Sequence, residues 1–440
     1  MKSTIMKYAQ DKKKLVCEND AVLPSLYTQF NVKRGLRDIN GKGVLTGLTN
    51  VSKIVSFDEN NVPCDGKLWY RGYRVETLIN KYIGEDEYGF EKIAYLLLFG
   101  ELPTENELAD FKAVIAHCRK LPRNFTKDVI MKAPGRDIMN SMTKSILTLA
   151  SYDKDIENND LETSIAQCIR LIALFPLLAV YGYHAYNHYK NEKSMYIHLP
   201  KAELSTAENL LLMLRPDCKY TSFEAKVLDT ALILHMEHGG GNNSTFTTRV
   251  VTSSGSDTYS TIAAAMSSLK GPRHGGANIK VAEMIRDIKR HVSNITSEEE
   301  VKKYLIGILE KENFDKKGLI YGMGHAIYSV SDPRERVFKK YVEELSVQKH
   351  RKNDMRLYNI IEESAPRIIA EKRKIYKGVS PNVDFYSGFV YDMLGIPAEL
   401  FTPIFAIARI VGWSAHRIEE IICDEKIIRP AYKSIMEEKE

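Results

Sequence analysis

Apolar residues recur at three- and four-residue spacing along most of this chain, which is the pattern of amphipathic helices. Pro103 and Pro403 each open a predicted helix, at positions where a missing N–H is tolerated. Runs typical of strands are few, at 44–46 and 51–55, and predict one small β element near the N-terminus. We therefore expect an all-α, multi-helical fold. The segments with helical spacing are 91–99, 138–151, 164–189, 204–214, 223–238, 258–269, 279–292, 298–310, 334–345, 353–374 and 403–422.

The charge pattern changes within the second half of the chain. Between residues 280 and 383 charged residues become more frequent and long apolar runs rarer, and apolar helices resume afterwards. We predict a large helical domain made of residues 1–279 and 384–440, with a small domain at 280–383. The polar loops described below fall at the junctions, where ligand clefts are common.

Composition excludes several classes of protein. The 440 residues include 62 basic and 57 acidic ones, a net charge of +5, which gives no case for nucleic-acid binding. Six cysteines are scattered singly, so reduced thiols and a cytoplasmic location are expected. The N-terminus has no apolar core typical of a signal peptide. The apolar run at 171–180 is too short to span a membrane and predicts a buried helix.

Three loops each present one titratable side chain. His274 lies in Gly-Pro-Arg-His-Gly-Gly-Ala-Asn (271–278), His325 in Gly-Met-Gly-His-Ala (322–326), and Asp384 in Pro-Asn-Val-Asp-Phe-Tyr-Ser-Gly (381–388). Glycine lets the backbone adopt positive φ and lets a substrate approach closely. Three groups of different chemistry in such loops indicate an acid/base site.

Two of these groups have two interpretations each. His274 precedes a predicted helix, whose dipole would keep the imidazole neutral and able to donate a hydrogen bond to an enolate; otherwise it caps local carbonyls. Asp384 precedes aromatic residues that would desolvate it and raise its pKa; otherwise it caps the next helix. His325 and Arg334 share a loop region that could hold a carbonyl and an adjacent carboxylate.

Three further residues stand out in helical segments. Arg409 lies in the apolar run 405–411, where a cation is costly without an anionic partner. Spacing alone leaves a buried acid of the protein and a ligand carboxylate equally open. His235 and His238 share a helix face, but the ligands of a metal site are missing. We interpret His235 as a hydrogen-bonded core histidine and His238, which precedes three glycines, as a substrate contact.

Taken in order, these motifs resemble the citrate synthase family over nearly the whole chain. The resemblance implies a mostly helical homodimer whose large and small domains close over oxaloacetate and then bind acetyl-CoA as co-substrate. It implies no metal or redox cofactor and no nucleic-acid or membrane partner. Besides the loops above, the matching segments are Gly35-Leu36-Arg37-Asp38, Gly43 to Thr49, the His238 segment, Asp332-Pro333-Arg334, Arg409, Trp413 and Arg429-Pro430.

The resemblance assigns roles by motif. Asp384 matches the base that removes a proton from the thioester methyl group, and His274 matches the donor that stabilises the resulting enol or enolate. His325 matches the acid that polarises the oxaloacetate carbonyl. The oxaloacetate-binding positions match His238, Arg334 and Arg409, and Arg429 matches an arginine lent by the partner subunit. For Arg409 the resemblance thus favours a ligand carboxylate.

The chain also departs from the family pattern. Arg273 replaces a small or apolar residue before His274, and the glycine run 239–241 is one residue longer than in many relatives. Ser329 stands where the family often has an arginine for the phosphates of coenzyme A. Phosphate contacts are then expected from three lysines of a basic segment. These are Lys372, Lys374 and Lys377.

Two alternatives to citrate synthase activity remain open at this level. A 2-methylcitrate synthase would use propionyl-CoA with the same residues, and one methylene is worth only about 1–3 kcal/mol in an apolar pocket. A catalytically inactive helical scaffold of the same fold is the other. The intact set of His274, His325 and Asp384 argues against the scaffold, because a binding protein has no need of all three.

Overall fold

A computed structural model describes most of the chain, in two compact units. The first comprises residues 1–48 and the second residues 49–440. The described residues are 2–38, 43–84, 87–324, 327–328, 330–373, 379–423 and 426–436.

The first unit is small and largely exposed. It contains α1 (Lys2–Asp20), α2 (Pro24–Gln29) and the 3-10 turn η1 (Arg34–Leu36). The predicted strand at 44–46 is wrong: the backbone there forms no strand, and the Val44 N–H donates to Leu36 O. A strand needs a neighbouring strand for its backbone groups, and among the described residues of this unit there is only an isolated bridge between Arg37 and Gly43.

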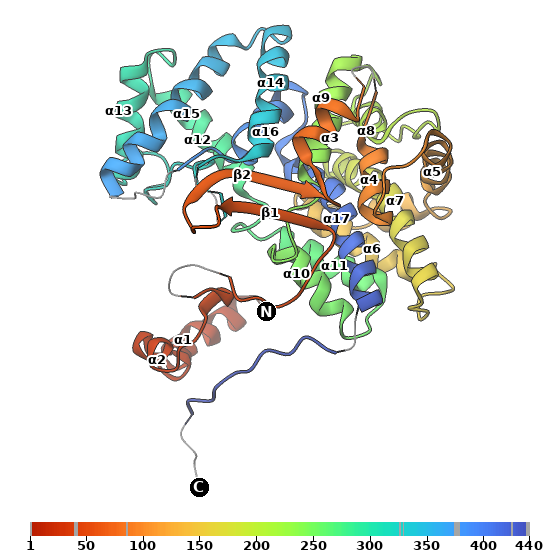
Figure 1. The fold of residues 1–440 in the computed structure, drawn as a ribbon, viewed down its shortest axis with the longest axis horizontal. Coiled ribbons are helices and arrows are strands. Elements are labelled where there is room, and N and C mark those ends of the chain that lie inside the picture. The colour runs from red at the N-terminus through yellow and green to blue at the C-terminus, as the bar shows by residue number, and fades with distance from the viewer. Residues whose placement is uncertain are drawn as a thin grey trace. The chain divides into compact units, whose positions relative to one another are not determined.

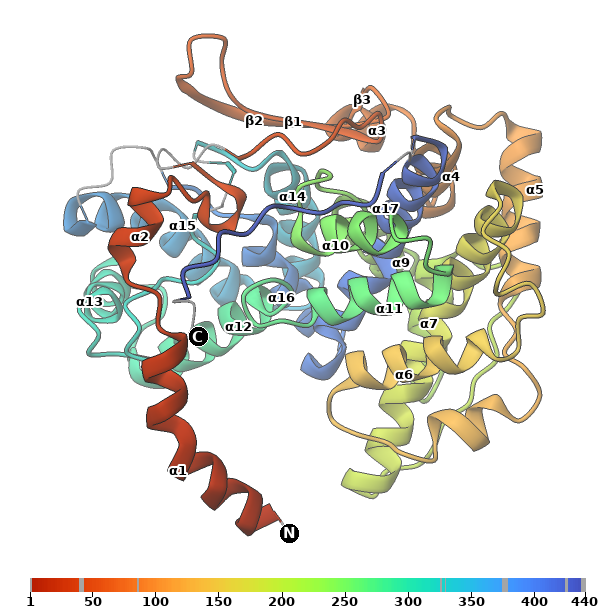
Figure 2. The ribbon, with the colours of Figure 1, turned by 90° about the horizontal axis from the view of Figure 1, so that it is seen from below.

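The second unit opens with a three-stranded antiparallel sheet in the order β1-β2-β3. The strands are β1 (Ser52–Phe57), β2 (Pro63–Tyr70) and β3 (Tyr73–Arg74), with Ser52 opposite Tyr70. The predicted strand at 51–55 is confirmed as β1. Figure 2 shows the β1–β2 hairpin along one edge of the helical body, close to α14 (Pro333–Gln348).

Helices make up the rest of this unit and confirm the mostly helical fold class. Figure 1 shows α12–α16 gathered on one side of the unit and α4–α11 on the other. The remaining elements are α3 (Val75–Lys81), α4 (Phe90–Phe99), α5 (Glu105–Cys118), the π-helical turn η2 (Thr126–Ile130), α6 (Ile138–Ala150), α7 (Leu161–Asn191), α8 (Thr206–Leu214), α9 (Ser222–His235), α10 (Asn243–Thr252), α11 (Thr258–Leu269), α12 (Ala277–His291), α13 (Glu298–Leu309), α15 (Lys352–Arg373), α16 (Val383–Met393), η3 (Ala398–Leu400) and α17 (Phe401–Cys423).

Capping residues explain where several helices begin. Thr104, Ser205 and Thr221 each accept a hydrogen bond from the backbone N–H three residues later, and a glutamate there returns the bond. Pro103 therefore lies just before α5 and not within it. Pro403 is the third residue of α17, still in the first turn where backbone N–H groups need no helical partner.

Helices α7 and α17 form the centre of the core. By length and composition, α7 and the segment Ala398–Cys423, which comprises η3 and α17, are long and apolar enough to cross a membrane. However, 72% and 89% of their most apolar stretches are buried inside the fold, which is typical of core helices. The predicted burial of 171–180 is confirmed.

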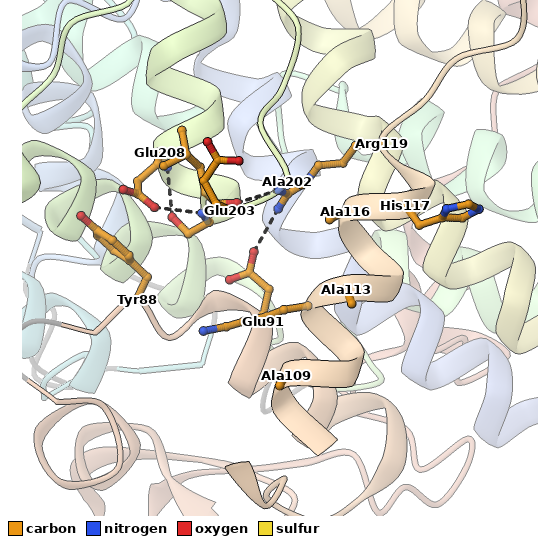
Figure 3. Close-up of a pocket in the computed structure, with 13 residues that line it drawn as sticks. Tyr88, Glu91, Ala109, Ala113, Ala116, His117, Arg119, Ala202, Glu203 and Glu208 are labelled. Atoms are coloured by element: carbon orange, nitrogen blue, oxygen red, sulfur yellow. Dashed lines mark hydrogen bonds and ion pairs between the residues drawn. The ribbon is translucent and has the colours of Figure 1, made fainter. Parts of the chain in front are cut away.

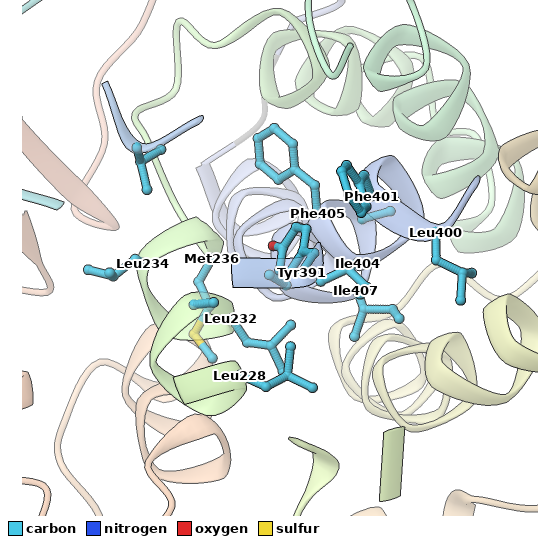
Figure 4. Packing of buried hydrophobic residues seen from close by; sticks show 14 of the residues in the cluster. Leu228, Leu232, Leu234, Met236, Tyr391, Leu400, Phe401, Ile404, Phe405 and Ile407 are labelled. Atoms are coloured by element: carbon cyan, nitrogen blue, oxygen red, sulfur yellow. The ribbon is translucent and has the colours of Figure 1, made fainter. Parts of the chain in front are cut away.

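The end of α9 packs tightly on α17. Figure 4 shows Leu228, Leu232 and Met236 facing Ile404 and Ile407 across this contact. Each such side chain contributes about 1.5–3 kcal/mol when fully buried. Beside them α17 carries Gly412, at which a Cβ atom would lie 2.4 Å from Met236 O and 2.5 Å from Glu237 Oε2. Close approach at Gly412 therefore brings α17 against the segment that follows α9.

This packing gives a stability prediction. Gly412→Ala is expected to lower the free energy of unfolding by roughly 1–3 kcal/mol, because the methyl group meets a backbone carbonyl that cannot turn away. Chemical denaturation measures the change. Gly135→Ala is the control, because no atom lies within 4 Å of its added Cβ, and it should stay within about 1 kcal/mol of wild type. Equal stability of the two variants would contradict the packing argument.

Candidate active site

The end of α9 and the loop after it place two histidines in the interior. His235 Nδ1 donates to Ala231 O at 2.7 Å, so Nε2 carries the lone pair. Burial lowers the pKa of His235 to about 3, and the ring is therefore neutral. The predicted hydrogen-bonded core histidine is confirmed. Its Nε2 also lies 4.0 Å from Asp384 Oδ1, which brings α9 and α16 together at this point.

His238 follows in a turn that requires glycine. Its ring is buried and packs edge-to-face on Tyr328, with ring centroids 5.4 Å apart. Gly239 has a φ of +86°, and a Cβ there would lie 2.8 Å from Ile54 Cδ1 of β1. Ile54 of the sheet therefore packs against the left-handed turn after His238. This turn sets the direction in which the chain enters α10.

His274 is held by two residues far away in sequence. Its Nε2 forms a 3.0 Å hydrogen bond with Ser244 Oγ of α10, and Trp413 Nε1 of α17 donates to the same oxygen at 3.1 Å. Ser244 Oγ also lies 3.0 Å from Asn242 Oδ1, so its single proton has two possible acceptors. The ring plane of His274 is therefore set by α10 and α17.

The imidazole of His274 is neutral, as the sequence predicted, but for another reason. Burial lowers its pKa to about 4, and the positive charge of Arg409 contributes next. Helix α12 does begin directly after it, at Ala277, but desolvation and a neighbouring cation are the principal causes. At neutral pH the ring can donate one hydrogen bond without first losing a proton.

Asp384 lies in the first turn of α16. Asn382 is the N-cap, since its side chain accepts the Asp384 N–H at 3.0 Å, so the capping alternative for Asp384 is wrong. Burial raises the pKa of Asp384 to about 6, against the opposing positive charge of Arg334. Its side chain keeps 20% of its surface exposed. This environment makes the carboxylate more basic than an ordinary aspartate while leaving it ionised at pH 7.

Arg334 forms a buried two-point ion pair at the start of α14. Its Nε and Nη2 donate to the two carboxylate oxygens of Asp332 at 3.0 and 2.7 Å. Burial alone would lower the pKa of Arg334, but Asp332 outweighs it and raises the pKa. The same aspartate caps α14 and accepts the Val383 N–H, so it joins the starts of α14 and α16.

Arg409 is buried without an ion-pair partner among the described residues. It is 1% exposed, its Nε donates to His235 O at 2.7 Å, and the guanidinium lies 4.7 Å from the Phe405 ring. Within the described part of the chain its Nη1 has no hydrogen-bond partner, and no carboxylate lies within 4.0 Å of the guanidinium. Burial lowers the pKa of Arg409 to about 10, so it stays charged.

Behind these groups lies a network that sequence reasoning missed. Glu237 Oε1 accepts hydrogen bonds from Ser52 Oγ at 2.9 Å and from the Gly239 N–H, and it pairs with His416 Nε2 at 3.0 Å. Burial would raise the pKa of Glu237, but His416, Arg409 and Ser52 together lower it to about 2. The sequence did show a glutamate, Glu237, between His235 and His238. Nothing in the spacing of residues, however, predicts that it pairs with His416.

The remaining predicted residues are exposed or lie outside the described residues. Lys372 is exposed in the last turn of α15 and pairs with Glu310 at 2.5 Å. Arg273 and Arg429 are exposed. In the described ranges, no group of three or more His, Cys, Asp or Glu side chains could hold a metal ion. Outside the described residues lie His325, Ser329, Lys374 and Lys377.

Comparisons with known proteins agree on one family. The family model described as "Citrate synthase, C-terminal domain" matches residues 39–431. The citrate synthase of Deinococcus radiodurans is 36% identical over 78% of this chain and 84% of its own length. The 2-methylcitrate synthase of Shewanella oneidensis is 34% identical over 83% and 87%.

Solved structures of citrate synthases share the fold. The enzyme of Pyrobaculum aerophilum has a TM-score of 0.75 at 27% identity, covering 91% of this chain and 92% of its own. The Thermoplasma acidophilum citrate synthase, in a ternary complex with carboxymethyl coenzyme A and oxaloacetate, has a TM-score of 0.75 at 29% identity, covering 93% and 98%. The chain belongs to the citrate synthase family.

Proposed function

We propose that the protein condenses acetyl-CoA with oxaloacetate and hydrolyses the product to citrate and coenzyme A. One observation carries the proposal. A neutral imidazole (His274), a carboxylate of raised pKa (Asp384) and a buried cation without a carboxylate partner among the described residues (Arg409) share one interior region. Proton abstraction beside a carbonyl needs the first two, and a dicarboxylate substrate needs the third.

The first step forms the carbon nucleophile. Asp384 removes a proton from the methyl group of the thioester, and the C–H electrons move to form an enol or enolate. His274 donates a hydrogen bond to the thioester oxygen as charge develops there. Trp413 Nε1 donates to Ser244 Oγ, and in the proposed arrangement the Ser244 hydroxyl proton points to His274 Nε2 and not to its other acceptor, Asn242 Oδ1. The ring proton is then on Nδ1, the nitrogen proposed to face the substrate.

The second step forms the carbon–carbon bond. The nucleophilic carbon attacks the keto carbon of oxaloacetate, and the keto oxygen takes a proton, in the proposed role of His325. Water then cleaves the thioester and releases the thiol of coenzyme A. This condensation and hydrolysis use protein side chains as acid, base and hydrogen-bond donor and require no metal or redox cofactor.

Binding of the substrates is assigned as follows. His238, Arg334 and Arg409 hold oxaloacetate, and Arg429 comes from the partner subunit of a homodimer. The large domain (1–279 and 384–440) and the small domain (280–383) close around the substrates. Lys372, Lys374 and Lys377 contact the phosphates of coenzyme A, and we place the enzyme in the cytoplasm.

The alternative acyl substrate is propionyl-CoA, because citrate synthases and 2-methylcitrate synthases both match this chain at similar identity. Thiol release with oxaloacetate, measured in parallel with acetyl-CoA and propionyl-CoA, tests the proposal. A higher kcat/KM with acetyl-CoA supports it, and a higher value with propionyl-CoA identifies a 2-methylcitrate synthase. No thiol release with either identifies an inactive scaffold.

Asp384→Asn is expected to lower turnover by several orders of magnitude while the Kd for oxaloacetate changes little. In wild type kcat/KM should fall as pH drops through about 6, because the raised pKa protonates the base there. Asp392→Asn on the same helix, with a 60% exposed side chain, is the control. If Asp384→Asn kept about a tenth of wild-type turnover, Asp384 would not be the base that removes the proton from the thioester.

Arg409→Lys should raise the Kd for oxaloacetate by about tenfold or more, measured by calorimetry. Lysine keeps the charge but loses the planar fork that binds a carboxylate at two points. Arg417→Lys on the same helix provides the comparison, because that buried arginine is held by hydroxyl and amide oxygens away from this site. Unchanged affinity for oxaloacetate in Arg409→Lys would mean that the guanidinium interacts with protein groups and does not bind the substrate.

Subunit mixing tests the shared site. Arg429→Ala protein and Asp384→Asn protein should each be inactive, and hybrid dimers should recover part of the activity. In a hybrid, one site combines intact Asp384 from one chain with intact Arg429 from the other. Native mass spectrometry confirms that hybrids form. If hybrids form and remain inactive, Arg429 acts in the active site of its own chain and not in that of the partner.

A further inference from the structure

Two of the glycine-flanked loops are joined by their backbones at the start of α16. The segments 322–324 and 380–382 form an isolated antiparallel bridge, with N–H···O distances of 2.8 and 3.0 Å. Along the chain, the first segment leads to His325, the proposed acid, and the second leads to Asp384, the proposed base. A group that fixes this junction therefore acts on both.

Asn382 contacts both sides of the junction with one side chain. Its Oδ1 accepts the Asp384 N–H at 3.0 Å, and its Nδ2 donates to Gly324 O, also at 3.0 Å. A backbone N–H only donates and a carbonyl only accepts, so a single orientation of the amide satisfies both contacts. Because the amide group is planar, the two contacts cannot move independently of each other.

The contact with Gly324 matters because the backbone there can turn. Gly324 has a φ of +82°, in the region that glycine enters most readily, and the nearest atom to an added Cβ, Val379 Cγ1, would lie 3.8 Å away. Packing around Gly324 thus leaves the plane of the following peptide bond open, and the hydrogen bond from Asn382 sets it. That peptide bond leads directly to His325.

On the other side of the junction, Asn382 fixes the first turn of α16. The N–H that it accepts belongs to Asp384 itself, at the second position of the helix. The next residue, Phe385, packs on the glycine loop, since a Cβ at Gly322 would lie 2.8 Å from Phe385 Cδ2. The cap therefore determines where the Asp384 side chain leaves the backbone, beside the loop that Asn382 also holds.

We propose that Asn382 is a positioning residue for the reaction. Its amide couples the direction of the 322–324 loop to the first turn of α16, so that acid and base keep a fixed separation. Asn382 acts through Asp384 and through the peptide bond after Gly324, and it transfers no proton itself. The inference rests on the proposed function, because it takes Asp384 and His325 as base and acid.

Three substitutions separate the two contacts. At neutral pH, Asn382→Asp and Asn382→Ser keep an oxygen that caps α16 but lose the donor to Gly324 O, whereas Asn382→Ala loses both. The first two should keep the wild-type Tm and lower kcat about tenfold or more. Their Kd for oxaloacetate should change less than about threefold. Asn382→Ala should lower both kcat and Tm. Wild-type kcat in Asn382→Asp and Asn382→Ser overturns the proposal, because Asn382 would then only cap the helix.

A cap on a helix that carries none of the proposed residues supplies the control. Ser205 caps α8 by accepting the Glu208 N–H at 3.2 Å, and Glu208 accepts the Ser205 N–H at 2.9 Å in return. Figure 3 shows Glu208 at the start of α8, beside a cavity that none of the proposed catalytic or substrate-binding residues lines. Ser205→Ala should lower the Tm and leave kcat within about twofold of wild type. If kcat falls as far in Ser205→Ala as in Asn382→Ser, lost stability explains both and the proposal is wrong.

Hydrogen exchange followed by mass spectrometry separates this inference from the proposed function, because it needs no substrate. Peptides that contain residues 322–324 should exchange at least about threefold faster in Asn382→Ser than in wild type, and at the wild-type rate in Ser205→Ala. Unchanged exchange in Asn382→Ser overturns the coupling. A wild-type protein that releases no thiol overturns the proposed function instead, and the exchange rates then still decide whether Asn382 couples the loop to the helix.

Discussion

The burial of the Arg409 guanidinium within α17 is the constraint on which the site depends. A cation in an apolar helix is costly, and here no carboxylate of the described residues compensates it directly. The His235 carbonyl, the Phe405 ring and the more distant charge of Glu237 stabilise it instead. An interior that holds an unmatched cation is prepared for an anionic ligand.

The same charge acts on the proposed catalytic groups. It helps to keep His274 neutral and lessens the rise that burial imposes on the pKa of Asp384. A neutral donor and an ionised base can therefore coexist at neutral pH in one buried region. The Glu237–His416 pair and the close contact at Gly412 hold α17 against the end of α9, so the position of Arg409 follows from the packing of the core.

Much of the fold could be predicted from the sequence, because the helices of the core carry a strong apolar period. The elements that were missed lack that signal. Helix α10 is rich in Thr, Ser and Asn, and β2 contains Pro63, Asp65 and Gly66. Local composition disfavours both, and tertiary contacts stabilise them, with Ser244 and Thr248 of α10 fully buried. The predicted strand at 44–46 failed for the opposite reason, since favourable residues had no strand to pair with among the described residues.

The candidate site divides in the same way. Glycine-flanked loops marked His274 and Asp384, and the cost of burying a cation marked Arg409. Partners could not be predicted, because Ser244, Trp413, Glu237 and His416 meet only in three dimensions. For that reason the neutrality of His274 was predicted with the wrong principal cause: the helix dipole is local in sequence, whereas burial and the field of Arg409 arise from packing.

A crystal structure of the protein with oxaloacetate tests the central claim most directly. The account predicts a carboxylate oxygen of oxaloacetate within hydrogen-bond distance of Arg409 Nη1, with the guanidinium still bound to the His235 carbonyl. A guanidinium turned onto Glu237 Oε2, with oxaloacetate bound elsewhere, would contradict it.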